Sequence, residues 1–414
     1  MNQICVIGLG YIGLPTAAVF SNHKIRVVGV DTNPNVVSTI NSGRIHIVEP
    51  QLAEVVKKVI KSGFLRATDK VEPSDTFIIA VPTPIDSFSR PNLKYVMKAV
   101  KDISSVLSPG NLIILESTCP PGTSKTVLKF LESLRPDLIM PNKLSKKNDI
   151  HFAYCPERVM PGNVLYEIIH NDRVIGGATP KCSELAKQFY EIISTGECII
   201  SSSPEIAELS KLAENSFRDV NIAFANELSM LCDKLSVNVW ELIKLANRHP
   251  RVNILRPGPG VGGHCIAVDP WFLINGNEEI TRVIKSARIQ NKAKTKYVLD
   301  TIEREVDRSR SSRMGGKLKI AILGITFKPD IDDFRESPAL EIALKLTQKL
   351  KNEIFIYDPL LDHCPNQLLK DYFLTDDVYN ISTFDLQILL VGHSHFRENI
   401  NKSGRLLDFV GLEE

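Results

Sequence analysis

Short hydrophobic runs alternate with longer amphipathic stretches over the first half of the chain. Runs bounded by turn residues, as parallel strands usually are, predict strands at residues 3–8, 25–30, 77–81 and 112–116. Two further runs, residues 152–154 and 173–176, are expected to add edge strands. Strands separated by helices in this way predict a doubly wound α/β domain of the Rossmann type, which we place at residues 1–203.

From Pro204 the pattern changes to helical periodicity. One helix is predicted from Pro204 to about Leu245 and a second, long one from Glu278 to about Asp307; a Gly/Pro-rich segment, RPGPGVGGHCIAVDP, separates them. We interpret residues 204–308 as a central helical dimerisation region that carries this segment. The polar stretch DRSRSSRMGGK (307–317) is interpreted as a solvated linker.

A second strand–turn–helix pattern begins after that stretch. Strands are predicted at residues 318–324, 354–357 and 387–391, and a helix from Glu336. This part, residues 309–414, is predicted to be a smaller, C-terminal Rossmann-like α/β domain.

Charge and cysteine content narrow the expected partners. With 50 Lys+Arg against 48 Asp+Glu, the net charge of +2 gives no reason to expect a nucleic acid or an anionic membrane. Residues 4–20 are nearly uncharged, but no basic region precedes them and glycines interrupt them, so we expect neither a signal peptide nor a membrane helix. Eight cysteines without a CxxC pair predict reduced thiols in the cytoplasm and no metal site.

A glycine-rich turn, Gly8-Leu9-Gly10-Tyr11-Ile12-Gly13, follows the first strand, and Asp31 ends the second. Glycines in a GxGxxG turn let a pyrophosphate approach the backbone, and the acidic residue accepts hydrogen bonds from the ribose. A carboxylate there would repel a 2′-phosphate, and Thr32 supplies no compensating cation. NAD is therefore the predicted cofactor; a tight turn without a ligand is the alternative.

Several other residues are candidates for chemistry. Cys265 lies among glycines and is followed by Asp269, a setting that favours access to the thiol. Lys211 and Asn215 are four residues apart on a predicted helix, so both project from one face. Thr83, Thr118 and Glu157 follow predicted strands, where doubly wound sheets bind their ligands. Each also has a simpler alternative: Cys265 fits an inert thiol, and Lys211 and Asn215 fit a solvated helix face. The residues that follow strands fit turn or cap positions.

Together, the segments GLGYIGLP, VPTP, ESTCPPGT, PER, ELSKLAEN, GVGGHCIAVDP and GITFKPDIDDFRES resemble the UDP-glucose/GDP-mannose dehydrogenase family. They occur in the family's order from residue 1 to about 340. HPRVNILRPGPGVGGHCIAVDPW and YCPERVMPG…HNDRVIGG are most similar to the branch acting on UDP-N-acetylmannosamine. The resemblance implies that NAD oxidises the C6 alcohol of a UDP-sugar to a carboxylate in two steps, through a cysteine thiohemiacetal and thioester, for polysaccharide biosynthesis.

The resemblance also implies roles for particular residues. Cys265 would be the nucleophile, with Lys211, Asn215 and Asp269 around the reacting centre, Glu157 as the acid/base of the hydrolysis and Thr118 helping to hold water. The implied NAD contacts are Gly8, Gly10, Tyr11, Ile12, Gly13, Asp31, Thr83, Thr118 and Arg335. The implied substrate contacts are Glu157, Arg158, Lys211, Asn215, His249, Arg251, Gly260, Gly262, Phe327 and Lys328. A homodimer, or a higher homo-oligomer, is also implied, with Arg251 reaching the substrate site of the other subunit.

The chain departs from the family in two places. Pro161 stands where many relatives that act on UDP-glucose have a second glutamate, and Leu407–Gly411 lacks the arginine of the family's D-x-R-type segment. UDP-N-acetylglucosamine, UDP-glucose and GDP-mannose stay open as substrates, because an acetamido group or one epimeric hydroxyl separates them. The other classes considered are a two-electron β-hydroxyacid dehydrogenase, which does not need Cys265, and a non-catalytic NAD-binding protein.

Overall fold

The computed structural model describes residues 3–142, 147–312, 317–350, 353–361, 364, 372, 384–399 and 405–412. The chain forms two compact units: Met1–Glu214 with Trp271–Asn275, and Asn215–Pro270 with Gly276–Glu414.

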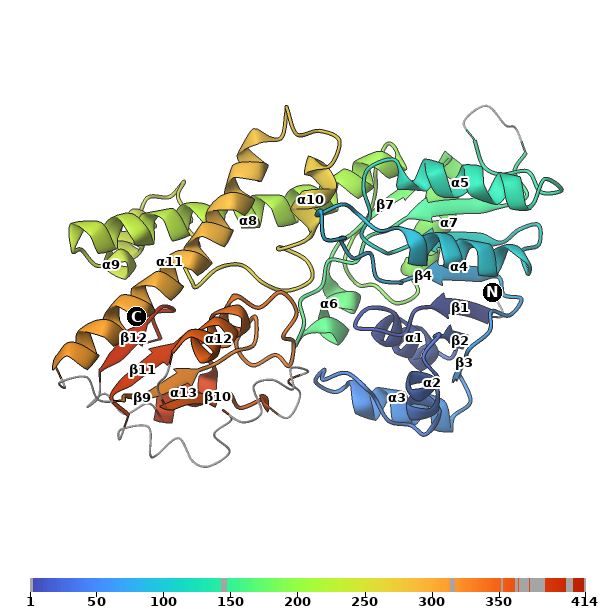
Figure 1. The fold of residues 1–414 in the computed structure, drawn as a ribbon. Helices are drawn as coiled ribbons and strands as arrows, with labels where there is room; N and C mark the ends of the chain where they lie inside the picture. Colours follow the sequence, from blue (N-terminus) through green and yellow to red (C-terminus); the bar gives the residue numbers. More distant parts are fainter. Residues whose placement is uncertain are drawn as a thin grey trace. The chain divides into compact units, whose positions relative to one another are not determined.

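The first unit is built on an eight-stranded sheet with the order β3-β2-β1-β4-β5-β6-β7-β8 (Figure 1). Neighbouring strands pair in parallel, except that β7 runs antiparallel to β6. The predicted parallel sheet of a Rossmann-type domain is thereby confirmed. The strands are β1 Gln3–Ile7, β2 Arg26–Val30, β3 Leu65–Thr68, β4 Thr76–Ile79, β5 Leu112–Leu115, β6 His151–Tyr154, β7 Arg173–Gly177 and β8 Cys198–Ile200.

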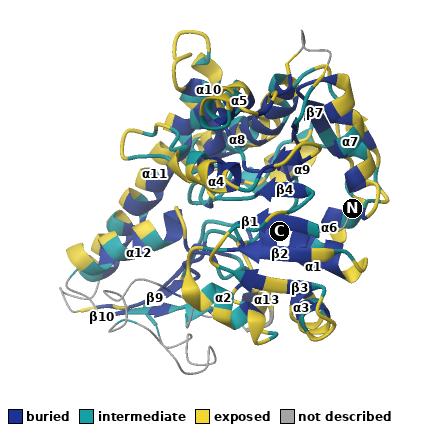
Figure 2. Ribbon diagram, turned by 90° about the vertical axis from the view of Figure 1, so that its right-hand side faces the viewer, coloured by how far each residue is buried: buried dark blue, intermediate teal, exposed yellow. Residues whose placement is uncertain are grey.

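Helices cover both faces of this sheet. Side chains alternate along β1, so that Ile4 and Val6 enter one hydrophobic core while Cys5 and Ile7 enter the other. Figure 2 shows the strands as buried and the outer faces of the helices as exposed. The helices are α1 Gly13–Asn22, α2 Pro34–Asn41, α3 Leu52–Lys61, α4 Lys94–Ser104, α5 Thr123–Leu134, α6 Val164–His170 and α7 Pro180–Tyr190.

The strands predicted at residues 152–154 and 173–176 are present as β6 and β7, but the prediction that they lie at the edge of the sheet is wrong. Strands β6 and β7 lie inside the sheet, and β8 forms the edge; β8 has only three residues, too few to give a recognisable pattern. Because β7 runs against β6, its first residue, Arg173, lies at the edge where β5 and β6 end. This reversal brings a guanidinium to the ligand-binding edge of the sheet.

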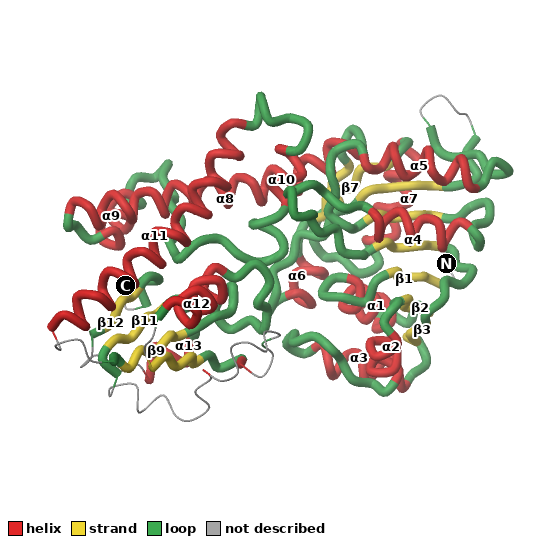
Figure 3. The backbone as a smooth tube through the Cα atoms, in the orientation of Figure 1, coloured by secondary structure: helices red, strands yellow, loops and turns green. Residues whose placement is uncertain are grey.

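The second unit combines long helices with a parallel four-stranded sheet of order β10-β9-β11-β12 (Figure 3). Its core includes Val298, Ile302 and Val306 of helix α11, which pack with β9 and α12. The helices are α8 Pro204–Leu235, which begins in the first unit, α9 Val239–Ala246, α10 Asp269–Ile274, α11 Arg282–Ser312, α12 Pro338–Lys349 and α13 Ser394–Asn399. The strands are β9 Lys319–Leu323, β10 Glu353–Tyr357, β11 Leu386–Leu389 and β12 Leu406–Asp408.

Two predictions about the helical region are wrong. The helix expected to reach Leu245 ends at Leu235: Ser236 takes a left-handed φ of 56°, and Asn238 caps a new helix by accepting hydrogen bonds from Trp240 and Glu241. The expected linker is helical as far as Ser312, because α11 continues through its first six residues. Residues 313–316 of that stretch lie outside the described part.

Arginine is a good helix former, and Arg308 pairs with Glu305 one turn earlier at 3.5 Å, which explains why this polar stretch remains helical. The division into three domains, with a boundary at residues 308/309, stays a prediction; helix α11 runs through that boundary.

Candidate functional site

The three glycines of the GxGxxG turn are required for different structural reasons. A Cβ atom on Gly13 would lie 1.8 Å from the carbonyl oxygen of Gly8, and one on Gly8, whose φ is +92°, would lie 2.6 Å from the Ala80 oxygen. A Cβ atom on Gly10 would meet nothing within 4 Å. Packing therefore requires glycine at two positions, whereas Gly10 leaves open space beside the backbone, as close approach by a dinucleotide pyrophosphate demands.

Asp31 lies beside this turn at the end of β2. Its carboxylate accepts hydrogen bonds from the backbone N–H groups of Leu9 at 3.1 Å and Asn33 at 2.8 Å. The residue stays partly exposed, as do Tyr11 and Ile12. Its carboxylate is thus held at the position where an NAD ribose binds in a Rossmann domain.

The loops after β4 and β5 are tied to each other. The Thr83 hydroxyl donates to the Thr118 carbonyl oxygen at 2.6 Å. Buried Glu208 of α8 accepts bonds from the N–H groups of Gly122 and Ser124 at 2.6 and 2.8 Å, an anion at the start of α5. The sequence analysis missed Glu208, because it looks like any polar helix residue until its burial is known.

Glu157 lies in the loop after β6 and is paired with a buried cation. Its Oε2 atom accepts a hydrogen bond from Arg173 Nη1 at 2.8 Å, and both side chains are almost fully buried. Arg158 points to other partners, with Nη1 2.6 Å from Glu214 Oε1. Arg173 was predicted only as part of a strand, since nothing in the sequence shows that its strand is reversed.

Cys265 ends a tightly packed glycine loop. The N–H of Gly263, whose φ is +81°, donates to the Arg335 carbonyl at 3.0 Å, and a Cβ atom on Gly262 would lie 2.6 Å from the Glu336 oxygen. All eight cysteines of the chain lie among the described residues, and Cys265 is the one that is not buried. Cys265 is therefore not a core thiol, and its role as the nucleophile stays a prediction.

Gly260, the other glycine predicted to contact substrate, has a packing reason as well: a Cβ atom there would lie 2.3 Å from Thr295 Oγ1. The contacts of Gly260 and Gly262 with substrate stay predictions.

Asn215 and Asp269 meet directly behind this loop. Asn215 Nδ2 donates to Asp269 Oδ2 at 2.6 Å, and the Asp269 N–H donates to the Cys265 carbonyl at 2.8 Å. Lys211, one turn earlier on α8, is 8% exposed and Asn215 is 7% exposed. The alternative of a solvated helix face is wrong for these two residues.

A buried ion pair holds the chain next to Cys265. Arg288 of α11 donates from Nη1 to Asp219 of α8 at 2.6 Å and to the Ile266 carbonyl at 3.2 Å. Burial lowers the pKa of Arg288 although Asp219 opposes the shift. Sequence reasoning missed this pair because each member lies on a long helix without a local motif.

His264, next to the thiol, belongs to a charged cluster. Its Nδ1 atom lies 2.9 Å from Arg335 Nη2 and 3.4 Å from Asp333 Oδ2. Burial disfavours a charged imidazole, but hydrogen bonds to Asp333 and Cys265 outweigh it and raise the pKa of His264 to about 9. Arg335 forms an ion pair with Asp333, in which Nη2 lies 2.6 Å from Oδ2. The contact of Arg335 with NAD stays a prediction.

The loop carrying Phe327 and Lys328 is fixed by a buried acid. Asp358 accepts bonds from the N–H groups of Ile325 at 2.7 Å and Thr326 at 3.2 Å, and from His393 Nε2 at 3.1 Å. Phe327 packs its ring against Gly263, where a Cβ atom would approach it to 2.7 Å.

Lys328 is partly buried, and His249 and Arg251 are exposed after α9. The substrate contacts predicted for Phe327, Lys328, His249 and Arg251 are not tested by the geometry.

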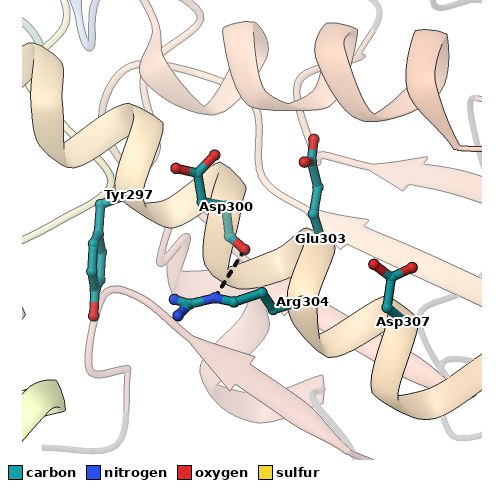
Figure 4. A pocket seen from close by; sticks show the side chains of 5 residues that line it. All are labelled: Tyr297, Asp300, Glu303, Arg304 and Asp307. Atoms are coloured by element: carbon teal, nitrogen blue, oxygen red, sulfur yellow. Dashed lines mark hydrogen bonds between the residues drawn. The ribbon is translucent and has the colours of Figure 1, made fainter. Parts of the chain in front are cut away.

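One pocket lies along helix α11 and is unsuited to a nucleotide. It has a volume of about 500 Å³, and Figure 4 shows its lining along successive turns of the helix. Three carboxylates face it with a single guanidinium, a balance that repels a diphosphate. The lining residues are Tyr297, Asp300, Glu303, Arg304 and Asp307.

The dinucleotide turn, the open space at Gly10 and the accessible thiol define an NAD-binding enzyme of the Rossmann class. Comparison with known families identifies it further. Residues 2–194 match the NAD binding domain of the UDP-glucose/GDP-mannose dehydrogenase family, residues 205–293 its central domain and residues 321–409 its UDP binding domain. The chain belongs to that family and is an NAD-dependent oxidoreductase; the predicted family, enzyme class and cofactor are confirmed.

Individual relatives match over nearly the whole chain. It is 51% identical to the UDP-N-acetyl-D-mannosamine dehydrogenase of Campylobacter jejuni over 400 residues, 96% of this chain and 97% of that protein. It is 49% identical to the NDP-N-acetyl-D-galactosaminuronic acid dehydrogenase of Ralstonia nicotianae over 397 residues, 96% and 92% of the two chains.

Among solved structures, the UDP-D-ManNAc dehydrogenase of Pyrococcus horikoshii superimposes with a TM-score of 0.86 at 36% identity, covering 100% of this chain and 96% of that one. Within the described residues, no helix combines the length and apolar character needed to cross a membrane.

Proposed function

We propose that this enzyme oxidises the C6 alcohol of UDP-N-acetyl-D-mannosamine to the uronate, consuming two NAD⁺ for each sugar. The observation that carries the proposal is the identity of about half of all residues, over 96% of the chain, with a UDP-N-acetyl-D-mannosamine dehydrogenase. Membership of a family with a UDP binding domain argues against a β-hydroxyacid dehydrogenase. The partly exposed thiol beside a buried Asn–Asp pair argues against a protein that only binds NAD.

The first oxidation would produce an aldehyde that the protein must retain. NAD, when bound, supplies the hydride acceptor for both oxidation steps. Lys211 would balance the charge that develops on the C6 oxygen as its proton leaves. The Cys265 thiolate would then add to the aldehyde carbon, and the resulting thiohemiacetal is a tetrahedral centre able to give up the second hydride.

Asn215 is suited to stabilise the oxygen of that centre. One preorganised oxyanion donor is typically worth ~3–4 kcal/mol in the transition state. Asp269 accepts one of the Asn215 N–H bonds at 2.6 Å, which fixes the orientation of the amide. Asp269 therefore acts in this proposal as the residue that aims Asn215.

Hydrolysis of the thioester would complete the reaction. Glu157, paired with Arg173 at 2.8 Å, would take a proton from water while the oxygen adds to the acyl carbon. Thr118 would help to hold that water. The bond to sulfur then breaks, and Cys265 leaves as a thiolate that later recovers a proton.

The active assembly is proposed to be a homodimer formed by the central helices. Exposed apolar side chains at Phe217, Phe224, Leu231 and Leu235 of α8 follow spacings of seven, seven and four, so they share one helix face. A second copy of the chain is the occupant that we propose for this face. Arg251, exposed after α9, would then reach the substrate of the partner subunit.

We further propose a cytoplasmic location, where reduced thiols are the rule, since all eight cysteines are free. The expected product, a UDP-linked uronic acid, suits the assembly of a surface polysaccharide.

The experiment that tests the function measures NADH formation with five sugars offered separately. These are UDP-N-acetylmannosamine, UDP-N-acetylgalactosamine, UDP-N-acetylglucosamine, UDP-glucose and GDP-mannose. The galactosamine epimer is the second candidate because of the Ralstonia relative. Fastest turnover on the mannosamine sugar, ending at two NADH per sugar, supports the proposal. Faster turnover on another sugar overturns the substrate, and one NADH per sugar overturns the four-electron reaction.

A further inference from the structure

A second carboxyl group lies buried behind Glu157. Glu116 directly follows β5 and is 3% exposed. Its Oε1 atom accepts a hydrogen bond from the Tyr190 hydroxyl at 2.6 Å. Among the described residues its Oε2 atom has no hydrogen-bond partner. The guanidinium of Arg173 lies over the Tyr190 ring at 4.4 Å and binds Glu157 at 2.8 Å.

Charge balance shows which of the two carboxyls holds a proton. The cluster contains one cation, Arg173, which is 3% exposed, and two acids. Glu157 has the direct ion pair, so it is the ionised partner. Glu116 has only a phenol for a partner, and an ionised carboxylate in such a place is costly. Burial, and then the charge of Glu157, raise the pKa of Glu116 to about 7.

Apart from Glu157 and Arg173, the titratable groups that act on Glu116 are Tyr190 and Cys155, and both are neutral. Burial raises the pKa of Cys155 to about 12 and raises that of Tyr190 well above its usual value. Burial also raises the pKa of Cys198 on β8. Helix α6 contributes the backbone carbonyl of Ile168, which accepts from Arg173 Nη2 at 3.0 Å. Near neutral pH, therefore, Glu116 is the group in the cluster whose charge changes.

We propose that Glu116 is a positioning residue for thioester hydrolysis, whose negative charge keeps Arg173 paired when Glu157 takes a proton from water. The inference rests on the proposed function. When Glu157 becomes neutral, the buried guanidinium loses its counterion, and leaving a buried charge unpaired is strongly unfavourable. Ionised Glu116 replaces that counterion, so proton transfer to Glu157 becomes easier. Glu116 thus supplies the second acid that Pro161 does not provide.

The test follows decay of the acyl adduct on Cys265 by intact-protein mass spectrometry, after a single turnover with NAD⁺ and UDP-N-acetylmannosamine, between pH 6 and 9. In the unaltered enzyme the decay rate should rise through about pH 7 as Glu116 ionises. Glu116→Gln keeps the shape and cannot ionise. Its decay should stay on the low-pH plateau, about tenfold slower at the alkaline end. Glu116→Asp, which restores an acid, should restore the rise.

Two outcomes would overturn the inference. One is a Glu116→Gln enzyme that is slower by the same factor at every pH, with the rise intact, as a purely structural role predicts. The other concerns a second variant, which is used if the glutamine variant does not fold. Tyr190→Phe removes the hydrogen bond that stabilises ionised Glu116, so the rise in the decay rate must move to higher pH. A rise that stays at the same pH contradicts the inference.

Failure of the proposed function looks different. In that case no sugar yields NADH and no adduct forms on Cys265 in any variant.

Discussion

At the scale of single residues, surroundings rather than residue type separate the eight cysteines. Seven are buried, and Cys265 alone is partly exposed, on a loop whose glycines are required by packing. Burial raises the pKa of Cys155 to about 12, which keeps that thiol unreactive. The difference in burial therefore separates a candidate nucleophile from the cysteines of the core.

Cys265→Ala should abolish formation of the uronic acid, because no thioester can form. We expect the rate to fall by about a thousandfold or more, with NAD affinity retained, as measured by product analysis and calorimetry. Cys232→Ala is the matched control: it removes a thiol that is 2% exposed, should cost about 1 kcal/mol of stability and should remain active. Near-normal acid production by Cys265→Ala would rule out the thioester route.

Two glycines of one turn provide a second residue-scale test. Gly13→Ala would place a methyl group 1.8 Å from the Gly8 oxygen, so the variant should be destabilised by about 3 kcal/mol or more. Gly10→Ala meets no atom within 4 Å and should fold normally, yet bind NAD about tenfold or more weakly, because the methyl group occupies the space proposed for the pyrophosphate. Thermal unfolding and NAD titration separate the two effects. Unchanged NAD affinity in Gly10→Ala would remove that assignment.

At the scale of elements, helix α8 has two different faces. One is buried and carries Lys211, Asn215 and Asp219, of which Lys211 and Asn215 are proposed to act in the site. Another carries the exposed apolar stripe of Phe217, Phe224, Leu231 and Leu235. A helix with apolar residues on an exposed face needs a partner to cover them.

Phe217→Ser combined with Phe224→Ser should shift the enzyme from dimer to monomer. These side chains are 68% and 50% exposed, so their loss should little affect folding of the subunit while removing the proposed contact. Light scattering coupled to size-exclusion chromatography measures the change. Phe88→Ser, at a 75% exposed phenylalanine outside α8, is the control that should leave the dimer intact. A double variant that stays dimeric at all concentrations would place the interface elsewhere.

At the scale of the whole molecule, positive and negative charges nearly cancel, so a few buried acids control how stability varies with pH. Asp358 is 3% exposed. Burial alone would raise its pKa, but hydrogen bonds and the charge of His393 outweigh burial and lower it. An acid with a lowered pKa in the folded state adds stability above its unfolded pKa of ~3.9, and that stability is lost as the pH falls below this value.

Asp358→Asn should therefore destabilise the protein by about 2–3 kcal/mol at neutral pH, with the difference from the unaltered protein shrinking toward pH 3. Urea unfolding at the two pH values measures it. His395→Ala, at an exposed histidine after β11, is the control. A deficit that stays constant down to pH 3 would show that Asp358 contributes by packing rather than by its charge.

The sequence by itself determined the local structure and the chemical candidates. Hydrophobic runs located β1, β2, β4 and β5 to within a few residues, because a strand buried on both faces must be apolar throughout. Strand β3, Leu65–Thr68, was missed, because it has only four residues and Arg66 within it is exposed. The glycine turn, Asp31 and the GGHC loop were recognised for a similar reason: their function depends on neighbouring residues in the chain.

Tertiary structure decided what depends on distant residues. The reversal of β7 places Arg173 beside Glu157, which lies 16 residues earlier in the chain. It also places Arg173 over the ring of Tyr190, whose hydroxyl binds Glu116. Likewise, Glu208 reaches the start of α5 and Arg288 meets Asp219 through the packing of helices. Burial and pairing set the charge of these groups. Neither can be predicted from the residues next to them in the sequence.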